Sequence, residues 1–209
     1  MARGNGRFML ITFSGLDGSG KSTQAQNVFA YLQQQGHSVQ LLHITRWTWV
    51  NRLGEWLFQS RKETTNAAPK PSAVKRVRWP QMLVMLVDVL RFWLLWGYCW
   101  ARKRPLVCDR YFYDLGVQAV YKGILPQNWL PWYWRLVPHP TLAFWLDVPP
   151  AIAQQREGEH EADYYHIKAN LYRAIEQSPH VIVVPSLSQA KVTAFVMGQI
   201  QQLELENKL

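Results

Sequence analysis

The sequence predicts an α/β fold, a three-layer sandwich in which a five-stranded parallel sheet carries helices on both faces. Five short apolar runs recur along the 209 residues, and they do not alternate with polar residues. Such runs are typical of parallel strands that are covered on both faces. Stretches of helical character separate them, and a glycine-rich turn joins the first run to the first helix. In such open sheets, ligands gather beyond the carboxyl ends of the strands.

The expected elements follow one another in a regular series. The apolar run 8–13 is the first strand, and a helix at 23–35 follows it after the turn. Further strands are expected at 38–44, 105–109, 141–147 and 180–184. Further helices are expected at 49–59, 80–102, 113–121, 149–156, 161–177 and 189–205. No internal repeat and no domain linker interrupts the series, so we expect a single domain over residues 1–209.

Composition agrees with one compact enzyme domain. A hydrophobic content of 48% suffices for a core, which excludes disorder as the overall state. The formal net charge of +9 fits nucleic acid, but it also fits a protein whose ligands carry several phosphates. We therefore expect a phosphorylated small molecule as the ligand and no nucleic acid polymer.

Cysteine usage and the start of the chain bear on location. Cys99 and Cys108 show no metal-binding or redox spacing, so reduced thiols in a cytosolic protein are the simplest explanation. The residues before the first strand lack the pattern of a cleavable signal peptide. A cytoplasmic location is therefore expected.

Residues 15–23, Gly-Leu-Asp-Gly-Ser-Gly-Lys-Ser-Thr, match the phosphate-binding loop (P-loop) pattern G-x-x-x-x-G-K-[ST] between a strand and a helix. The glycines let the backbone curl around a phosphate, so that amide groups and the helix start converge on the anion. Lys21 can bridge the outer phosphates, and the Ser22 hydroxyl is a natural ligand of magnesium. The loop thus predicts a P-loop NTPase-type fold that binds a nucleoside triphosphate with Mg²⁺. The residues expected to bind it are Gly15, Asp17, Gly18, Ser19, Gly20, Lys21, Ser22 and Thr23. A glycine-rich turn that binds nothing is the alternative, and it leaves the Lys21–Ser22 pair unexplained.

The second chemical element is the apolar strand that ends at Asp109 and is followed by Arg110. In a parallel sheet the end of this strand is expected beside the P-loop. There Asp109 would hold the magnesium shell or polarise an acceptor, and Arg110 would clamp a phosphate through two hydrogen bonds. A surface Asp-Arg pair without function is the alternative, but its combination with the loop motif favours function.

The segment from Met82 to Trp100 is long enough to span a bilayer, but it contains Asp88 and Arg91 near its middle. Each charge would cost roughly 2.5–3.5 kcal/mol at a membrane centre, so we expect a buried helix of a globular domain. At helical spacing the two charges lie opposite a face with three tryptophans. The charged face predicts an internal ion pair or the wall of a ligand cleft, and the tryptophan face predicts core or a subunit contact. The three tryptophans are Trp93, Trp96 and Trp100.

Two stretches break the regular pattern. Residues 61–78 mix basic and small polar residues with proline and are expected to form a mobile basic loop. Residues 125–140 place three tryptophans and a tyrosine between prolines, and a packed cap over the domain is the expected structure. The alternative for this tryptophan-rich insertion is contact with a membrane surface or with the acceptor.

Four pieces of the sequence together resemble the thymidylate kinase family over most of the chain. They are the loop at 15–24, Asp109-Arg110-Tyr111, the segment 146–150 with Arg156 after it, and the last strand at 181–184 leading to Pro185. The loop alone is specific for phosphate rather than for thymidylate. The order and spacing of all four pieces are much more specific.

The resemblance implies transfer of the γ-phosphoryl group of ATP to a nucleoside monophosphate, with dTMP as the default, usually by a homodimer. It implies that Lys21 and the loop amides hold ATP, that Arg156 begins a lid at about 154–165, and that Pro185 lies in the adenine-contacting turn. Catalytic roles fall to Lys21, Asp109, Arg110 and Arg156, and magnesium to Ser22 and Asp109. Acceptor binding falls to Asp17 at the sugar, Arg110 at the phosphate, and Arg91, Asp109 and Tyr111.

Three departures from the family pattern concern the acceptor. In the family, an arginine on the long helix grips the acceptor monophosphate, and it commonly comes directly after an aspartate. Here Val89 follows Asp88, and the nearest arginine is Arg91, almost a turn further on. The serine expected shortly after Asp-Arg-Tyr is replaced by Tyr113 and Asp114. Between residues 157 and 163 the lid has four acidic residues and no arginine or lysine.

Two other functions stay open beside the nucleoside monophosphate kinase. One is a related kinase that acts on a modified sugar nucleotide, a nucleoside or an envelope-precursor metabolite. The other is a module that binds ATP without turnover. The Asn-Lys-x-Asp signature of guanine binding is absent from useful internal positions, which argues against a GTPase switch.

Overall fold

The computed structural model describes residues 8–50, 79–158, 160–175 and 181–206. Most of the helix expected at 49–59 and the loop expected at 61–78 lie outside these residues.

Five parallel strands form the sheet in the order β2-β3-β1-β4-β5. The strands are β1 (Leu10–Gly15), β2 (Gln40–His43), β3 (Leu106–Asp109), β4 (Leu142–Asp147) and β5 (Val181–Pro185). The expected α/β fold with an all-parallel sheet is therefore confirmed. Strand β1 lies at the centre, where the order of the strands reverses, so the loop after it sits at the topological switch point.

The register of the strands aligns their carboxyl ends. Asp109 at the end of β3 pairs with Phe13 of β1 on one side and with His43 of β2 on the other. Gly15 at the end of β1 pairs with Leu146 of β4. The P-loop, the Asp109–Arg110 turn and the end of β2 consequently emerge on the same edge of the sheet.

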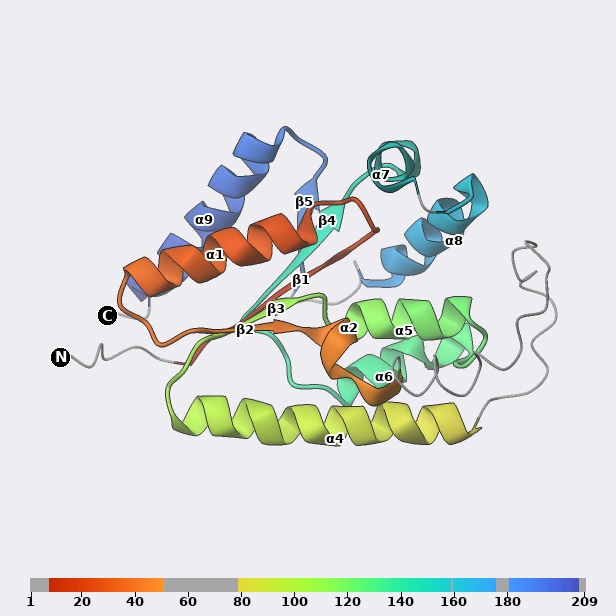
Figure 1. The fold of residues 1–209 in the computed structure, drawn as a ribbon, viewed down its shortest axis with the longest axis horizontal. Coiled ribbons are helices and arrows are strands. Elements are labelled where there is room, and N and C mark those ends of the chain that lie inside the picture. The colour runs from red at the N-terminus through yellow and green to blue at the C-terminus, as the bar shows by residue number, and fades with distance from the viewer. Residues whose placement is uncertain (1–7, 51–78, 159, 176–180, 207–209) are drawn as a thin grey trace.

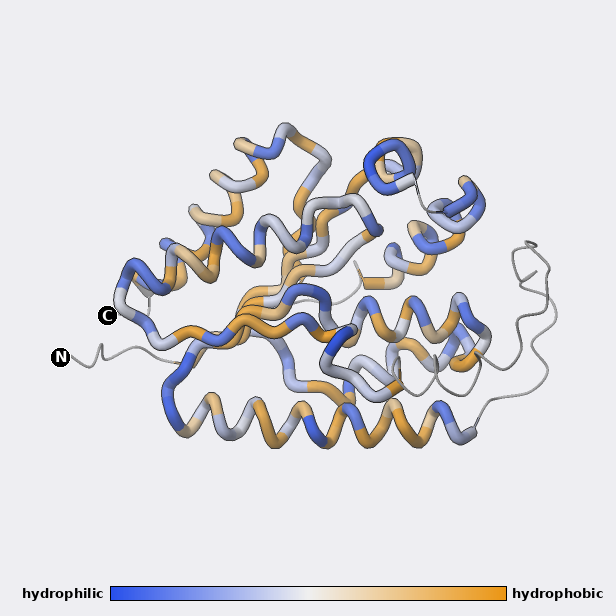
Figure 2. The backbone as a smooth tube through the Cα atoms, in the orientation of Figure 1, coloured by the Kyte–Doolittle hydropathy of each residue, from blue (hydrophilic) through white to orange (hydrophobic). Residues whose placement is uncertain are grey.

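Helices cover both faces of the sheet (Figure 1). Helices α1 (Lys21–Gln34) and α9 (Gln189–Glu206) pack on one face over a core that includes the stacked rings of Phe13 and Phe144. Helices α4 (Trp79–Ala101), α5 (Phe112–Tyr121) and α6 (Leu130–Arg135) lie on the other. Figure 2 shows that the central strands and much of α4 are hydrophobic.

Short elements lie at the carboxyl edge of the sheet and in the connections. Helix α2 (Ile44–Trp47) follows β2, and a 3₁₀ turn, η3 (Gln127–Trp129), precedes α6. Helices α7 (Pro150–Glu157) and α8 (Ala162–Tyr172), with the turn η4 (Arg173–Ile175), occupy the region between β4 and β5. The helix expected at 161–177 therefore ends as α8 at Tyr172, and the 3₁₀ turn follows it.

The tryptophan-rich insertion forms the packed cap that the sequence predicts. Tyr133 and Trp134 of α6 are buried against α5. A β-carbon at Gly116 of α5 would come within 2.8 Å of Trp134 and Leu130, so the close approach of the two helices requires glycine there. Trp132 is the exposed tryptophan of the insertion.

Asp88 of α4 is an internal charge. Its buried carboxylate accepts hydrogen bonds from the backbone amides of Trp49 (2.9 Å) and Val50 (3.0 Å) and from Nη1 of Arg91 (2.7 Å). The Arg91 guanidinium lies 4.4 Å from the ring centroid of Trp47 and 4.3 Å from that of Trp49. Of the two alternatives for the charged face, the internal ion pair is the one the structure shows.

Helix α4 buries only one of its apolar faces. It is long and apolar enough to cross a membrane, and a third of its most hydrophobic 18-residue window is buried. The expectation of a buried helix is thus met only on the side that carries Met85, Val89 and Phe92. The opposite side, called the α4 outer face below, exposes nine large apolar side chains. They are Trp79, Leu83, Leu86, Val87, Leu90, Trp93, Leu94, Tyr98 and Trp100.

Candidate active site

The P-loop is wedged between the end of β4 and helix α7. Gly15 and Gly18 both have positive φ, at 144° and 80°. A β-carbon at Gly15 would lie 2.6 Å from the carbonyl oxygen of Leu146, and one at Gly18 would lie 2.7 Å from that of Ala153. Glycine is therefore required at both positions, by backbone conformation and by lack of space.

A cavity of about 290 Å³ opens on one side of the loop. Its lining includes the predicted residues Gly18, Ser19, Gly20, Thr23, Arg156 and Pro185. Leu146, Val148, Leu187 and Val192 supply apolar walls, and Gln24 and Gln189 supply amides. A space with apolar walls at one part and a glycine loop at another suits the base and the phosphates of a nucleotide.

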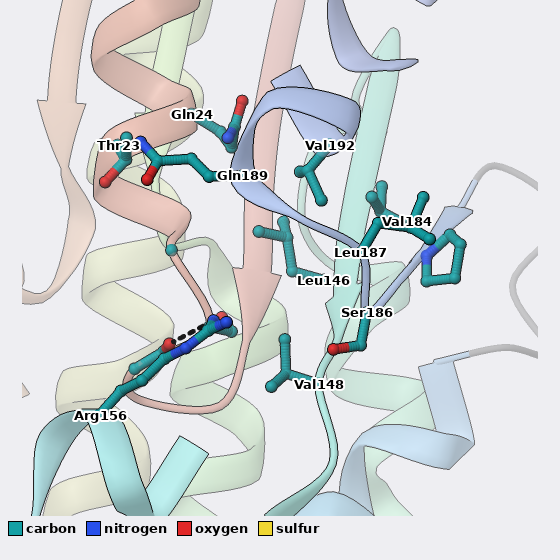
Figure 3. A pocket seen from close by; sticks show the side chains of 14 residues that line it. Thr23, Gln24, Leu146, Val148, Arg156, Val184, Ser186, Leu187, Gln189 and Val192 are labelled. Atoms are coloured by element: carbon teal, nitrogen blue, oxygen red, sulfur yellow. Dashed lines mark hydrogen bonds between the residues drawn. The ribbon is translucent and has the colours of Figure 1, made fainter. Parts of the chain in front are cut away.

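Arg156 joins helix α7 to the P-loop. Its Nη1 donates a hydrogen bond to the carbonyl oxygen of Gly18, at 3.4 Å, and the side chain is exposed. Figure 3 shows Arg156 near one end of the first cavity, with Thr23 and Gln189 near the other end. The one cation of the predicted lid therefore lies at the phosphate loop.

A second cavity, of about 320 Å³, opens on the other side of the loop and is called the acceptor cavity below. It brings together the predicted acceptor residues Asp17 and Arg110. Among the described residues, its charged lining holds three cations and two carboxylates, which gives a net attraction for an anion. The lining residues are Asp17, Thr45, Arg46, Arg110, Asp114, Leu115, Gln118, Tyr164 and Lys168.

Asp17 is surrounded by positive charge. Its Oδ1 lies 2.7 Å from Nη2 of Arg110 and 3.9 Å from Nζ of Lys21. Its Oδ2 accepts a 2.7 Å hydrogen bond from the Tyr164 hydroxyl and lies 3.5 Å from Nζ of Lys168. Burial alone would raise the pKa of Asp17, but Lys168, Arg110 and Lys21 lower it well below its ordinary value. Asp17 is therefore a permanent anion among cations.

Lys168 is a functional candidate that the sequence analysis did not identify. Its side chain is 5% exposed, and Nζ donates a 2.6 Å hydrogen bond to the Tyr164 hydroxyl. Burial lowers the pKa of Lys168 to about 8, while the Asp17 carboxylate opposes that shift. Tyr164 and Lys168 are four residues apart on α8, so their spacing already places both on one face of that helix.

Lys21 turns back onto its own loop. Its Nζ donates to the carbonyl oxygens of Gly15 (2.9 Å) and Leu16 (2.5 Å), and the residue is 4% exposed. Burial and the nearby Arg110 lower the pKa of Lys21. Ser22, the next residue, is exposed at the first turn of α1.

Asp109 fits the predicted magnesium role in its chemistry. It is buried, Oδ1 has no hydrogen-bond partner among the described residues, and Oδ2 lies 3.5 Å from Nε2 of His43. No cluster of three or more His, Cys, Asp or Glu side chains occurs in the described part of the chain. An oxygen donor set of one carboxylate and the Ser22 hydroxyl suits Mg²⁺, which completes its shell with phosphates and water.

Asp114 ties the P-loop to its surroundings. Its carboxylate accepts hydrogen bonds from Ser14 Oγ (2.7 Å), Gly15 N (3.2 Å), Tyr111 N (2.8 Å) and Tyr172 Oη (2.7 Å). These partners belong to β1, the turn after β3 and helix α8. Asp114, which together with Tyr113 stands where a serine was expected, therefore holds three chain segments together.

Three predicted acceptor residues, Asp109, Arg91 and Tyr111, are not among the described residues that line the acceptor cavity. Arg91 is engaged by Asp88 and the tryptophan rings. Tyr111 is fully buried, and its hydroxyl donates to the carbonyl oxygen of Pro138. Tyr111 therefore serves the core, while the exposed Arg46 supplies the cavity with a cation that the sequence analysis did not assign.

Comparison with known proteins yields consistent matches. A family model described as thymidylate kinase matches residues 13–178. The chain is 47% identical over 153 residues to the thymidylate kinase of Chlorobium luteolum, in an alignment that covers 71% of this chain and 66% of that protein. It is 25% identical to the thymidylate kinase of Chlorobaculum parvum, over 94% of this chain and 97% of that protein.

A solved structure is similar over nearly the whole chain. The thymidylate kinase of Candida albicans matches with a TM-score of 0.69 and 17% identity, covering 95% of this chain and 93% of that one. At this identity the similarity shows the fold, a P-loop NTPase-like α/β fold.

The four hydrogen bonds to Asp114 predict a large effect of its removal. In Asp114→Ala the amides of Gly15 and Tyr111 lose their acceptor inside the protein, so we expect a loss of about 2–4 kcal/mol in the free energy of unfolding. Tyr172→Phe removes one donor and leaves the carboxylate, and a loss of about 1 kcal/mol is expected. Urea denaturation measures both variants. Equal stabilities of the Asp114→Ala protein and the unmodified protein would contradict the role of Asp114.

Proposed function

The chain belongs to the thymidylate kinase family and is an ATP-dependent nucleotide kinase, and we propose that it transfers the γ-phosphoryl group of ATP to dTMP. One observation supports this most strongly. Asp17 and Gly18, adjacent in the P-loop, line two different cavities. The loop is thus a shared wall, and a nucleotide bound on each side would bring its phosphates to the same turn of backbone.

In the proposed arrangement ATP occupies the first cavity. Its base lies among Leu146, Val148 and the Val184–Leu187 turn, and its phosphates follow the backbone amides of the P-loop. Lys21 exchanges the loop carbonyls for phosphate oxygens, and Arg156 reaches the loop from helix α7 within the same cavity. Phosphoryl transfer requires positioning and neutralisation of charge above all, and both cations supply it.

The acceptor nucleotide occupies the acceptor cavity, with its phosphate toward Arg110 and Arg46 and its sugar toward Asp17. This orientation follows from charge, because a phosphate placed against the Asp17 carboxylate would be repelled. A monophosphate is already an anion at neutral pH, so no side chain has to remove a proton from it. The principal task of Arg110 is to offset repulsion between the two phosphate groups.

Magnesium would be held by Ser22 and Asp109, whose unpartnered Oδ1 is suited to it. When bound, the ion would neutralise the phosphates of ATP and hold them in one geometry. The free and buried thiols of Cys99 and Cys108 support a reducing, cytoplasmic location as part of this proposal.

The placement of Arg91 favours one competing acceptor class. Since Asp88 and two tryptophans engage Arg91, the cation that the resemblance puts on the acceptor phosphate is displaced. A different acceptor, such as a sugar nucleotide, would suit a cavity whose guanidinium groups, among the described residues, are those of Arg110 and Arg46.

We also propose that the protein is a homodimer whose two copies meet through the α4 outer face. The 23-residue helix makes this face about 34 Å long. Its nine apolar side chains offer area on the order of the 800 Å² that a standard interface buries from each partner. A two-fold pair covers the same surface on both copies, and the two charges of the helix are already paired internally.

The kinase activity is tested with purified protein, ATP, Mg²⁺ and a panel of nucleoside monophosphates. We expect ADP release with dTMP at the highest kcat/KM. Lys21→Ala should lower kcat about 100- to 1000-fold, because it removes a cation from the developing charge. Lys103→Ala, a change in the turn after α4, serves as the matched control and should leave the rate unchanged.

Absence of ADP release with every nucleoside monophosphate of the panel would contradict the proposed acceptor class. ADP release from a sugar-nucleotide or lipid extract would then support the competing acceptor, and tight ATP binding without turnover would support a non-catalytic module. A near-normal rate in the Lys21→Ala protein would remove the P-loop lysine from the mechanism.

The dimer is tested by light scattering on the unmodified protein and on Leu90→Glu/Leu94→Glu. We expect twice the chain mass for the unmodified protein and the single-chain mass for the variant, because buried carboxylates without partners are costly. Ile152→Glu, at another exposed apolar position, is the control and should stay dimeric. A single-chain mass for the unmodified protein, or a monomer that binds lipid vesicles through the α4 outer face, would contradict the proposal.

A further inference from the structure

The wall of the acceptor cavity contains a buried lysine whose ammonium group has a hydrogen-bond donor left for a ligand. Lys168 lines that cavity although its side chain is 5% exposed. Taking an ammonium group out of water is costly unless it is paired and hydrogen-bonded. Its ammonium has three donor hydrogens, and the acceptors placed around it in the described structure are Tyr164 Oη and Asp17 Oδ2. One donor is left for a molecule in the cavity.

The two oxygens of Asp17 separate the cations around it. Oδ1 faces Arg110 and Lys21, at 2.7 Å and 3.9 Å. Oδ2 faces Tyr164 and Lys168, at 2.7 Å and 3.5 Å. Arg110 and Lys168 therefore approach the carboxylate from different oxygens, and the part of an acceptor beside Oδ2 is distinct from the part beside Arg110.

The chemistry of a group that touches both Asp17 and Lys168 is restricted. Asp17 stays ionised, so it can only accept hydrogen bonds, and Lys168 can only donate them while it is protonated. A phosphate or carboxylate would be repelled by Asp17. A protonated amino group can only donate to Asp17, and a carbonyl can only accept from Lys168. A hydroxyl satisfies both, because it donates its hydrogen and accepts on its oxygen.

We propose that Lys168 donates a hydrogen bond to the acceptor's sugar hydroxyl whose hydrogen Asp17 accepts, and that Lys168 thereby selects acceptors with a hydroxyl at this position. This inference rests on the proposed function, because it takes the occupant of the cavity to be a nucleoside monophosphate. It adds a substrate-binding residue on α8 to those on the P-loop and the turn after β3. Tyr164 holds the Lys168 ammonium at Asp17 through its 2.6 Å and 2.7 Å hydrogen bonds.

The experiment combines a change in the protein with a change in the acceptor. KM and kcat are measured for dTMP and for its analogue without the sugar hydroxyl, with the unmodified protein and with Lys168→Met. Methionine keeps the length of the side chain and removes the donor. Lys103→Met makes the same chemical change outside both cavities and is the control. Thermal denaturation reports whether each variant folds.

We expect Lys168→Met to raise the KM for dTMP about tenfold or more, because a hydrogen bond from a charged group is lost. The KM for ATP should stay within about twofold, since the first cavity is untouched, and Lys103→Met should change neither. With the analogue that lacks the hydroxyl, the unmodified protein and Lys168→Met should have the same KM within about twofold. The hydrogen bond between Lys168 and the sugar hydroxyl cannot form with this analogue in either protein.

Two results would overturn the inference. One is an equal rise in KM for both acceptors, which is what a purely structural lysine gives. The other is no change for either. If Lys168→Met does not fold, Lys168→Gln takes its place. Its amide is a shorter and uncharged donor, so the KM for dTMP should still rise above that of the unmodified protein, while the KM for the analogue should stay within about twofold. Absence of turnover by the unmodified protein with every nucleoside monophosphate would instead contradict the proposed function.

Discussion

The ion pair between Asp17 and Arg110, at 2.7 Å, is the contact on which the site depends. It joins the P-loop after β1 to the turn after β3, two segments that strand pairing already brings side by side. Asp114 adds a second tie between the same segments through hydrogen bonds to Gly15 N and Tyr111 N. The loop is consequently fixed before any nucleotide binds, so less ordering is needed on binding.

The distribution of charge around Asp17 bears on how ATP and the acceptor would be placed in the two cavities. Lys21, Arg110 and Lys168 all converge on Asp17, which leaves the centre of the site with an excess of positive charge. Such an excess, held in a partly buried place, is what the phosphates of ATP and of a nucleoside monophosphate need in order to approach each other. The two oxygens of the Asp17 carboxylate hold Arg110 and Lys168 apart, and its negative charge opposes a phosphate on the side where Lys168 and Tyr164 lie.

Local sequence patterns predicted the parts that depend on local physics. The five strands and the loop follow from apolar runs and glycine spacing. The position of Asp109 beside Phe13 of β1, two residues before the loop, follows from parallel strands that end at one edge. Lys168 was missed because its role needs α8 to pack against a loop about 150 residues earlier in the chain. The seating of Arg91 between Trp47 and Trp49 likewise depends on a tertiary contact, and the apolar pattern of α4 does not say which side is covered.

The fate of a labelled γ-phosphoryl group tests the central claim most directly. Protein is incubated with Mg²⁺, dTMP and ATP that is radiolabelled in the γ-phosphoryl group, and the products are separated by chromatography. A P-loop shared by two nucleotide cavities predicts that the label appears as the β-phosphate of dTDP, in step with ADP. Label released only as inorganic phosphate, or retained in ATP while dTMP stays unchanged, would contradict it.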